Sequence, residues 1–477
     1  MKPDERVPKE ILSLLDGQGV FFLIKGGAGS GKTSLALELL RHYRDRNGIY
    51  LSTRVSPQKL YKHFPWVKEA LKPEFVTDVT KSYEGEAESE FSAFESLGVV
   101  FQFFEEFYER ACRLKNPVIV VDSWEGIAKR MAEKERMKTE NVLVALIEKA
   151  NANLIFISEE PQQTVLDYLA DGVVILNKSD LEEEQPFHSR LIREIEIQKA
   201  RGTAIKQFKY LFTLSGGRFQ FFEPFEMELP AKPVKPEPVL DKSDEVSTGI
   251  EDLDKLLDGG YQKGSFNLLE IEYGVGTAYN CLIFSAIVNF LNQSRGVAIL
   301  PSEGTTAKTF YKGIGPFTEN FEKCAKVIER GDAEEKEARP YVVSVPLKGK
   351  TYGEIDRSMH MEWIKTIRKL ERETGGKPVL GVLGLDALEY EHGLSEIEKE
   401  IAIGVSAIKD SDNVVIGIAR QGQELIDKLS QISSTHFKVK NVDGAVVMYG
   451  VVPRTEVYDI SVDVSKGYGE VKLTPIV

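Results

Sequence analysis

Short apolar runs alternate along the chain with segments in which apolar residues recur at helical spacing. In the first half, the runs Val20–Ile24, Gly48–Ser52, Val118–Asp122 and Asn153–Ser158 predict strands, because a strand covered on both faces shows no polar alternation. Between the first two runs, Thr33–Arg46 has the spacing of a helix. Strands that alternate with helices predict an α/β fold with a mostly parallel sheet flanked by helices.

The second half of the chain repeats this order. The strand Ser265–Ile271 is followed by a glycine-containing turn, a helix near Asn280–Asn292 and the strand Gly296–Leu300. An internal duplication explains the repeated order better than chance does.

Two later segments also correspond between the halves. The apolar run that ends at Asp122 matches the run that ends at Asp386, and Ala170–Val174 matches Val442–Val446. Insertions change the separation of the matching positions, but their order stays the same. The sequence therefore predicts two tandem domains of one fold.

A proline-rich segment separates the halves. Prolines at positions 230, 233, 236 and 238 remove backbone donors and favour extended backbone. We expect one domain in residues 1–228, a semi-rigid linker in 229–240 and a second domain in 241–477. Acidic runs at Glu84–Glu90, Glu182–Glu184 and Gly331–Arg339 are expected to be solvated loops.

The overall charge argues against nucleic acid as the main partner. The net charge is −13 and the isoelectric point is about 5.3, and an acidic field does not attract phosphodiester backbones. A local basic patch would still allow such binding. Three cysteines without CxxC spacing predict neither a zinc site nor a disulfide framework. No apolar stretch reaches the length of a membrane span, so we expect a cytoplasmic protein.

Residues 26–33 contain the full GxxxxGK[ST] pattern of a phosphate-binding loop. Small residues let successive backbone N–H groups point at phosphate oxygens, and the following helix directs its positive end at the anion. Lys32 adds a charge at the β- and γ-phosphates, and Thr33 offers its hydroxyl to Mg²⁺. The predicted nucleotide-binding residues are Gly26, Gly27, Ala28, Gly29, Ser30, Gly31, Lys32, Thr33 and Ser34.

Asp122 is the candidate second ligand of the magnesium ion. It closes an apolar strand, and the carboxyl ends of strands in an open α/β sheet form the ligand crevice. There its carboxylate would hold the Mg²⁺ that Thr33 ligates. The alternative is an ordinary helix N-cap.

Four segments resemble KaiC-like and RadA-like ATPases of the RecA superfamily. They are the stretch Ser247–Gly264, the pair Asp122-Ser123, the late strand Leu169–Val173 and the hairpin Ile197–Thr203. The tandem layout is similar to that of KaiC. The segment Tyr50–Pro57, beside a single intact loop, resembles the archaeal GvpD-like P-loop proteins.

The resemblance implies RecA-like domains, ATP and Mg²⁺ as ligands, and assembly into oligomers or rings. In KaiC-like rings, the lysine and arginine of the hairpin reach the nucleotide of the neighbouring subunit. The matching residues are Lys199 and Arg201, which would place positive charge where it develops in the transition state. Alternatively, both are solvated charges on a hairpin.

The first half departs from this pattern at one place. Hydrolysing members carry glutamate after the second core strand, where this chain has Thr53-Arg54-Val55. We therefore expect slow hydrolysis, or a substitute among Glu125, Glu159 and Glu160. Arg54 either contacts phosphate or lies in solvent.

The second half departs further. Thr277 and Ala278 replace the loop lysine and the Mg²⁺-binding hydroxyl, and Glu272 would repel phosphate. Asp386 remains without a metal partner, and no KxR hairpin follows Asp443. The second domain is expected to bind no nucleotide and to serve packing, oligomerisation or partner binding.

These features predict an ATP-binding regulatory or assembly protein with, at most, a slow ATPase activity. Its partner would be another protein or further copies of the chain. The alternative is a RadA-like or RecA-like ATPase acting on DNA in recombination or repair. The acidic charge and the lack of a basic N-terminal module count against that alternative.

Overall fold

The chain folds into two compact units, described here from a computed structural model. The described residues are 6–43, 48–71, 76–78, 112–129, 131–160, 162–181, 189–331, 339–346, 352–387 and 404–477. Unit 1 comprises Met1–Glu223 with Ile476–Val477, and unit 2 comprises Pro224–Pro475. The acidic runs Glu84–Glu90 and Glu182–Glu184, and most of Gly331–Arg339, lie outside the described residues.

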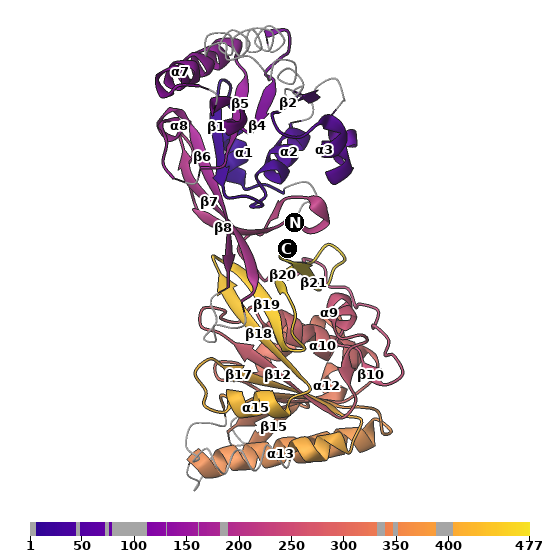
Figure 1. Cartoon of the computed structure of the whole chain (residues 1–477). Helices are drawn as coiled ribbons and strands as arrows, with labels where there is room; N and C mark the ends of the chain where they lie inside the picture. The colour runs from indigo at the N-terminus through magenta and orange to yellow at the C-terminus, as the bar shows by residue number, and fades with distance from the viewer. Residues whose placement is uncertain are drawn as a thin grey trace. The chain divides into compact units, whose positions relative to one another are not determined.

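In the described part of unit 1, nine strands form one sheet in the order β3-β2-β4-β5-β1-β6-β7-β8-β9. The strands from β3 to β6 pair in parallel, and β6 to β9 continue antiparallel. Their bounds are β1 Phe21–Gly26, β2 Ile49–Ser52, β3 Val76–Asp78, β4 Val118–Asp122, β5 Asn153–Ser158, β6 Gly172–Asp180, β7 Leu191–Ala200, β8 Lys209–Thr213 and β9 Gln220–Phe221. Figure 1 shows the long β6–β7 hairpin beside the parallel strands.

Helices cover both faces of this sheet. Side chains of α1 and α2, such as Ile11 and Leu35, join one buried cluster, and Ile127 of α6, Leu143 of α7 and Leu166 of α8 join the cluster on the other face. Burial of apolar side chains on both faces explains why the central strands are apolar throughout. The helices are α1 Lys9–Leu15, α2 Lys32–His42, α3 Pro57–His63, α4 Val67–Ala70, α6 Glu125–Ala128, α7 Glu133–Ala150, α8 Val165–Leu169 and the 3₁₀ turn η4 Ser215–Gly217.

Unit 2 contains a larger sheet of the same kind. Within its described residues, ten strands follow the order β15-β14-β13-β16-β17-β12-β18-β19-β20-β21, and β10 and β11 form a separate pair. Their bounds are β10 Glu245–Val246, β11 Tyr261–Gln262, β12 Ser265–Ile271, β13 Val297–Leu300, β14 Ala325–Arg330, β15 Val342–Val345, β16 Leu380–Gly384, β17 Val414–Arg420, β18 Thr435–Val442, β19 Ala445–Val452, β20 Val457–Asp463 and β21 Glu470–Pro475.

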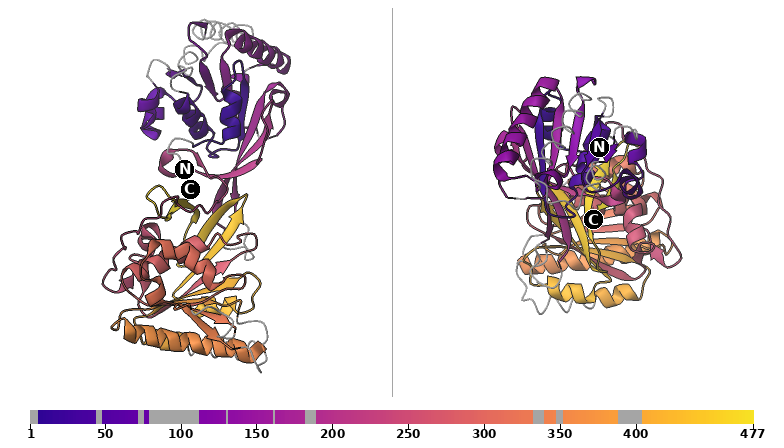
Figure 2. Two further views of the ribbon diagram at one scale, coloured as in Figure 1. Left: turned by 180° about the vertical axis from the view of Figure 1, so that it is seen from behind. Right: turned by 45° about the horizontal axis from the view of Figure 1, so that its top comes forward.

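The helices of unit 2 also lie on both faces. Those from α9 to α12 contribute to one buried cluster, and α13 and α15 contribute to the other. Figures 1 and 2, which view the chain from different sides, show that α13 lies across one face of this sheet. The helices are α9 Glu251–Leu256, α10 Asn280–Asn292, α11 Ala307–Ile314, η5 Gly315–Phe317, α12 Phe321–Cys324, α13 Tyr352–Glu373 and α15 Ile426–Ile432. Among the described helices, none is long and apolar enough to span a membrane.

The two sheets have the same strand order. Replacing each strand of unit 1 by its counterpart gives β14-β13-β16-β17-β12-β18-β19-β20-β21, so unit 2 differs by the added edge strand β15. The pairing of β1 with β6 places Phe22 beside Gly172, and the pairing of β12 with β18 places Asn267 beside Thr435. The two domains predicted from the repeated pattern therefore share one α/β fold.

This register corrects two of the sequence matches. Gly172 corresponds to Thr435, whereas Asp443 lies at a positive φ of 48° in the turn between β18 and β19. The match of Ala170–Val174 to Val442–Val446 is therefore wrong. Asp122 pairs with Ile157, and the counterpart of Ile157 pairs with Gly384, so Asp386 lies two residues beyond the position of Asp122. A shared Asp-Gly pair is too short to fix a register, whereas backbone pairing fixes it.

The proline-rich segment lies against unit 2 and is bound there. The backbone N–H of Val234 donates to the Gly467 carbonyl at 2.8 Å. Asn289 of α10 accepts from the Val239 N–H at 2.8 Å and donates to the Val239 carbonyl at 3.2 Å. Asn292 donates to the Pro236 carbonyl at 3.1 Å. These bonds restrain a segment that the sequence predicts as a spacer.

Candidate phosphate-binding site

The loop after β1 has the backbone shape that phosphate binding needs. Gly29 and Gly31 have φ values of +71° and +102°, which glycine adopts without strain. A Cβ on Gly27 or Gly29 would meet no atom within 4 Å, whereas one on Gly26 would lie 2.5 Å from the Leu176 carbonyl oxygen. The loop is therefore open on one side and tightly packed where it leaves the strand.

Lys32 begins α2 and folds back over the loop. Its Nζ donates to the carbonyls of Gly26 and Gly27, each at 2.7 Å, and the residue is 8% exposed. Burial lowers the pKa of Lys32, while the nearby carboxylates, Glu159 first and then Asp122, act to raise it. The ammonium group thus lies among oxygen acceptors at the mouth of the loop.

Thr33 and Asp122 meet although they are far apart in sequence. Thr33 Oγ1 donates to Asp122 Oδ2 at 2.6 Å, so the two predicted metal ligands lie side by side. The Tyr50 hydroxyl donates to the same carboxylate oxygen at 2.6 Å. Burial, and then the Asp122 charge, raise the pKa of Tyr50 well above its ordinary value, so the hydroxyl keeps its proton and donates a hydrogen bond. Sequence analysis missed Tyr50, because a tyrosine inside an apolar strand shows no sign of its partner.

Several buried polar atoms around the loop have no partner within the chain. Among the described side chains they include Ser30 Oγ, Ser123 Oγ and Glu125 Oε2. Buried polar groups are ordinarily hydrogen-bonded, and unpaired ones mark places where a ligand, ion or water belongs. Together with the Thr33 and Asp122 oxygens, they provide the hard oxygen donors that Mg²⁺ prefers. The residues at the loop therefore fit a phosphate and its magnesium ion.

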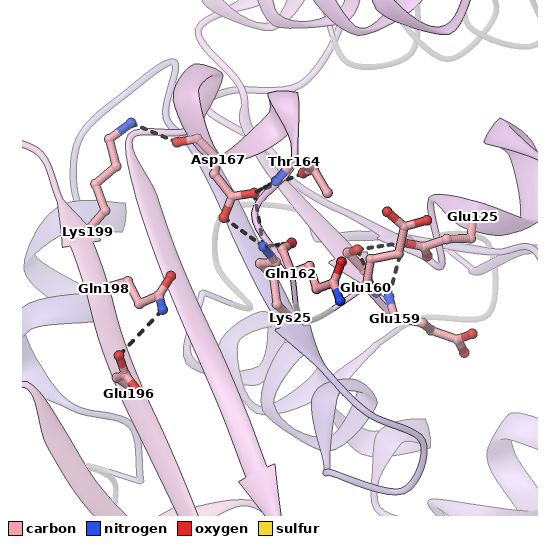
Figure 3. A network of polar contacts seen from close by, with 11 residues as sticks. Lys25, Glu125, Glu159, Glu160, Gln162, Thr164, Asp167, Glu196, Gln198 and Lys199 are labelled. Atoms are coloured by element: carbon pink, nitrogen blue, oxygen red, sulfur yellow. Dashed lines mark hydrogen bonds and ion pairs between the residues drawn. The ribbon is translucent and has the colours of Figure 1, made fainter. Parts of the chain in front are cut away.

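Glu125 organises the end of β5, as Figure 3 shows. Its Oε1 accepts from the Ser158 hydroxyl at 2.5 Å and from the Glu159 backbone N–H at 3.0 Å. Glu125 is 3% exposed, while Glu160 is exposed. Of the three carboxylates considered as substitutes for the missing glutamate, Glu125 and Glu159 lie close enough to influence Lys32.

Arg54, expected either to contact phosphate or to lie in solvent, is partly exposed and pairs with a carboxylate. Its guanidinium group forms an ion pair with the Glu159 carboxylate, and the two side chains are 40% and 35% exposed. Arg54 also acts electrostatically on Lys32. Arg54, which stands after β2 where the resemblance implies a glutamate, therefore pairs with Glu159 from the end of β5.

A buried ion pair lies next to the start of the loop (Figure 3). Lys25, the residue before Gly26, is 1% exposed, and its Nζ lies 2.8 Å from Asp167 Oδ1 in α8. Asp167 also accepts from Thr164 and completes a capping box at the start of α8. Lys199 donates to the Asp167 carbonyl at 3.0 Å. Sequence analysis assigned no role to Lys25, since only the fold reveals its partner.

Lys199 and Arg201 lie at the other end of the strands from the loop. Ala200 pairs with Gly172, and Gly172 lies beside Phe22, four residues before Gly26 on β1. Four residues of strand correspond to roughly 13 Å. Arg201 forms an ion pair with Asp171 at 2.8 Å. In the described residues, Lys199 thus contacts the Asp167 carbonyl and Arg201 contacts Asp171, and their action on a neighbouring nucleotide stays a prediction.

The corresponding loop of unit 2 differs in detail from the sequence expectation. The helix α10 begins at Asn280, so Thr277 and Ala278 stand in the turn before it. Glu272 is not a bare negative charge, because Lys440 Nζ lies 3.2 Å from its Oε2. The predicted repulsion of phosphate by Glu272 is therefore weaker than the sequence implies. The missing lysine and hydroxyl remain the main differences between the loops.

Arg420 reaches into the loop of unit 2. By strand register it is the counterpart of Glu159. Its guanidinium lies 3.5 Å from Asp386 Oδ2 and donates to the Gly276 carbonyl and the Tyr279 hydroxyl, both at 3.4 Å. A side chain of the protein itself thus contacts the loop that lacks a lysine.

The hairpin of unit 2 retains one of the two predicted cations. The bulge in the β6–β7 pairing falls after Val173, and the bulge in the β18–β19 pairing falls after His436. With this register, Val452 corresponds to Lys199 and Arg454 to Arg201. The sequence shows no KxR motif here, because a valine stands at the position of the lysine.

Comparison with known proteins agrees with this geometry. Residues 14–198 match the family model described as "GvpD gas vesicle protein, P-loop domain", and residues 235–314 match "GvpD basic region 2". In this chain the second stretch contains seven Lys or Arg and eleven Asp or Glu residues. In this chain the stretch is therefore acidic, and its charge does not favour an acidic partner.

Similar proteins include members of two groups. Protein GvpD2 of Halobacterium salinarum is 26% identical over 98% of this chain and 96% of its own length. Protein GvpD1 of the same organism is 25% identical over the same shares. The circadian clock oscillator protein KaiC of a Picosynechococcus species is 26% identical over 53% of this chain and 49% of its own length. The matched phosphate loop, the two sheets of one topology and these similarities together establish that the chain is a P-loop protein of the GvpD-like and KaiC-like type.

Proposed function

We propose that this protein is a regulatory ATP-binding protein in which unit 1 holds Mg²⁺-ATP or ADP. The observation that carries the proposal is the hydrogen bond between Thr33 and Asp122 at the mouth of an open glycine loop. Two oxygen ligands for one ion and a loop lysine meet there from separate parts of the chain. A bound magnesium ion would neutralise phosphate charge at this place.

Each residue of the site then has a physical task. The backbone N–H groups of the loop and the start of α2 surround the phosphates. Lys32 exchanges its bonds to the Gly26 and Gly27 carbonyls for bonds to phosphate oxygens. Such an exchange replaces neutral acceptors by anionic ones, so that Coulomb attraction adds to the hydrogen bonds. Thr33 and Asp122 hold the metal side of the ligand.

Unit 2 is proposed to present contacts to a protein partner or to further copies of the chain. Its loop has Thr277 in place of the lysine and Ala278 in place of the Mg²⁺-binding hydroxyl, and Arg420 contacts the loop. Nucleotide occupancy of unit 1 would then set the conformation or assembly state. By mass action, a ligand that binds only one state shifts the population toward it.

Isothermal titration of the full chain with Mg²⁺-ADP tests this function. We expect about one site per chain, and Lys32→Ala should abolish measurable binding. Glu223→Gln, which removes an exposed carboxylate paired with Lys9, serves as the matched control and should bind as wild type does. Two sites per chain, or unchanged binding by Lys32→Ala, would show the assignment to be wrong.

A further inference from the structure

The ion pair between Arg54 and Glu159 lies directly in front of the candidate metal carboxylate. Arg54 follows β2 and Glu159 follows β5, and these two strands flank β4 on either side. Asp122 ends β4. The pair therefore spans the end of the strand that supplies Asp122.

The backbones on both sides of the pair are fixed. The Thr53 N–H donates to the Asp122 carbonyl at 2.8 Å, and the Ser123 N–H donates to Thr53 Oγ1 at 2.9 Å. On the other side, the buried Glu125 carboxylate accepts from the Glu159 N–H at 3.0 Å. The side chains of Arg54 and Glu159 remain partly exposed. A ligand would therefore change the contacts of these side chains without moving the strands.

The pair is also close to the ammonium group of Lys32, on which both of its charges act. In a phosphate loop this lysine contacts the β- and γ-phosphates. A γ-phosphate held by Lys32 would then lie on the side of the loop that faces Arg54 and Glu159, whereas a diphosphate lacks this group. One charge of the pair attracts that phosphate and the other repels it.

Unit 2 shows how far a side chain from this position reaches. Arg420, the counterpart of Glu159, contacts the Gly276 carbonyl at 3.4 Å. Gly276 is the counterpart of Gly31, the residue before Lys32. By the same register Arg54 corresponds to Glu303, so the two positions carry opposite charges in the two units. An arginine at the Glu159 position therefore reaches the loop itself.

We propose that Arg54 and Glu159 form a selector that distinguishes nucleoside triphosphates from diphosphates. The γ-phosphate competes with the Glu159 carboxylate for the Arg54 guanidinium, which pairs well with either anion. With a diphosphate bound, the ion pair persists. This inference rests on the proposed nucleotide site and adds the residues that read the nucleotide state.

The test compares the affinities of Mg²⁺-ADP and of a non-hydrolysable ATP analogue for the full chain. Arg54→Ala should weaken binding of the analogue about 10-fold or more, the loss expected for one charge-assisted hydrogen bond, and should change ADP binding less than about 2-fold. Glu159→Gln should tighten analogue binding several-fold, because a competitor for Arg54 and a negative charge are removed. Arg54→Lys should restore only part of the affinity, since it lacks the planar fork.

The double variant Arg54→Ala/Glu159→Gln should behave like Arg54→Ala, because Glu159 acts mainly through Arg54. Glu223→Gln is the control for loss of an exposed carboxylate and should change neither affinity. Equal losses for ADP and the analogue, or changes of the same sign in Arg54→Ala and Glu159→Gln, would overturn the selector. If Lys32→Ala loses all binding but Arg54→Ala binds the analogue as wild type does, the selector is refuted and the nucleotide site is not. Unchanged binding in Lys32→Ala would refute the nucleotide site itself.

Discussion

Lys25 Nζ lies 2.8 Å from the carboxylate of Asp167, and both side chains are almost fully buried. Lys25 immediately precedes the first glycine of the phosphate loop, and Asp167 lies in the short helix α8. Lys25 also donates to the Gln162 carbonyl at 2.6 Å. Lys25 therefore connects the end of β1 with the segment that follows β5.

Removing the cation of this pair should destabilise unit 1. Lys25→Met leaves Asp167 as a buried and partly unpaired charge, and the loss of one partner of a buried pair costs about 3–5 kcal/mol. Chemical denaturation of the full chain would measure this change. Lys9→Met, which breaks an exposed pair, should cost about 1 kcal/mol or less. Equal effects of the two substitutions would contradict the structural role of Lys25.

The cost of Lys25→Met should depend on pH. Burial opposes ionisation of Asp167, but hydrogen bonds from Lys25 and Thr164 outweigh it and lower its pKa. The stability that this lowered pKa contributes is present above the unfolded value of about 3.9 and is lost as the pH falls through the lower folded value. The difference between wild type and Lys25→Met should therefore shrink below about pH 4. A difference that stays constant from pH 7 to pH 3 would assign the effect to packing.

Asp122→Asn should reduce the magnesium dependence of nucleotide binding. The amide keeps the size of the side chain and removes the charge that favours Mg²⁺. We expect affinity for ADP in the presence of Mg²⁺ to approach the affinity measured with chelator. Thr33→Ser retains the hydroxyl and should keep the dependence, whereas Thr33→Val should lose it. The idea fails if Asp122→Asn responds to Mg²⁺ as wild type does.

Hydrolysis by the isolated protein should be slow, well below about 10 per second, the median for enzymes. A water-positioning carboxylate is absent after β2, and Glu159 is held by Arg54. If turnover is measurable, Glu159→Gln should lower it, because Glu159 is the partly exposed carboxylate that acts most strongly on Lys32. Turnover at or above the median would show that an efficient base exists.

Arg201 is predicted to act on the nucleotide of another chain. Arg201→Ala should leave nucleotide binding at low protein concentration nearly intact and reduce hydrolysis and ATP-dependent assembly. Mixing Lys32→Ala chains with Arg201→Ala chains should restore some activity, because mixed interfaces pair a good loop with a good arginine. A mixture that stays inactive under conditions where wild type is active would refute action between chains.

Arg454, at the corresponding turn of unit 2, provides the matched control for Arg201. It has the same register on the hairpin, but the phosphate loop of unit 2 lacks the lysine. Arg454→Ala should therefore leave hydrolysis at the wild-type level. Equal losses in Arg454→Ala and Arg201→Ala, measured by phosphate release at the same protein concentration, would argue against a specific role of the first hairpin.

Local pattern alone predicted much of the fold. The bounds predicted for β4, β5, β12 and α10 coincide with those observed, because apolar periodicity reports burial directly. The phosphate loop was equally visible, since its glycines and lysine are contiguous and their backbone shape depends on local sequence. The repeated order of elements was sufficient to predict two domains of one fold.

The tertiary structure decided everything that depends on which strands are neighbours. It joined Thr33 with Asp122, Arg54 with Glu159 and Lys25 with Asp167. It also replaced Gly444 by Thr435 as the counterpart of Gly172 on the late strand, and revealed the correspondence of Arg454 with Arg201. Strand pairing is set by the packing of whole elements, so residues distant in the chain become partners only when the sheet has formed. A single sequence specifies the elements and the contiguous loop, while the sheet specifies the partners of each charge.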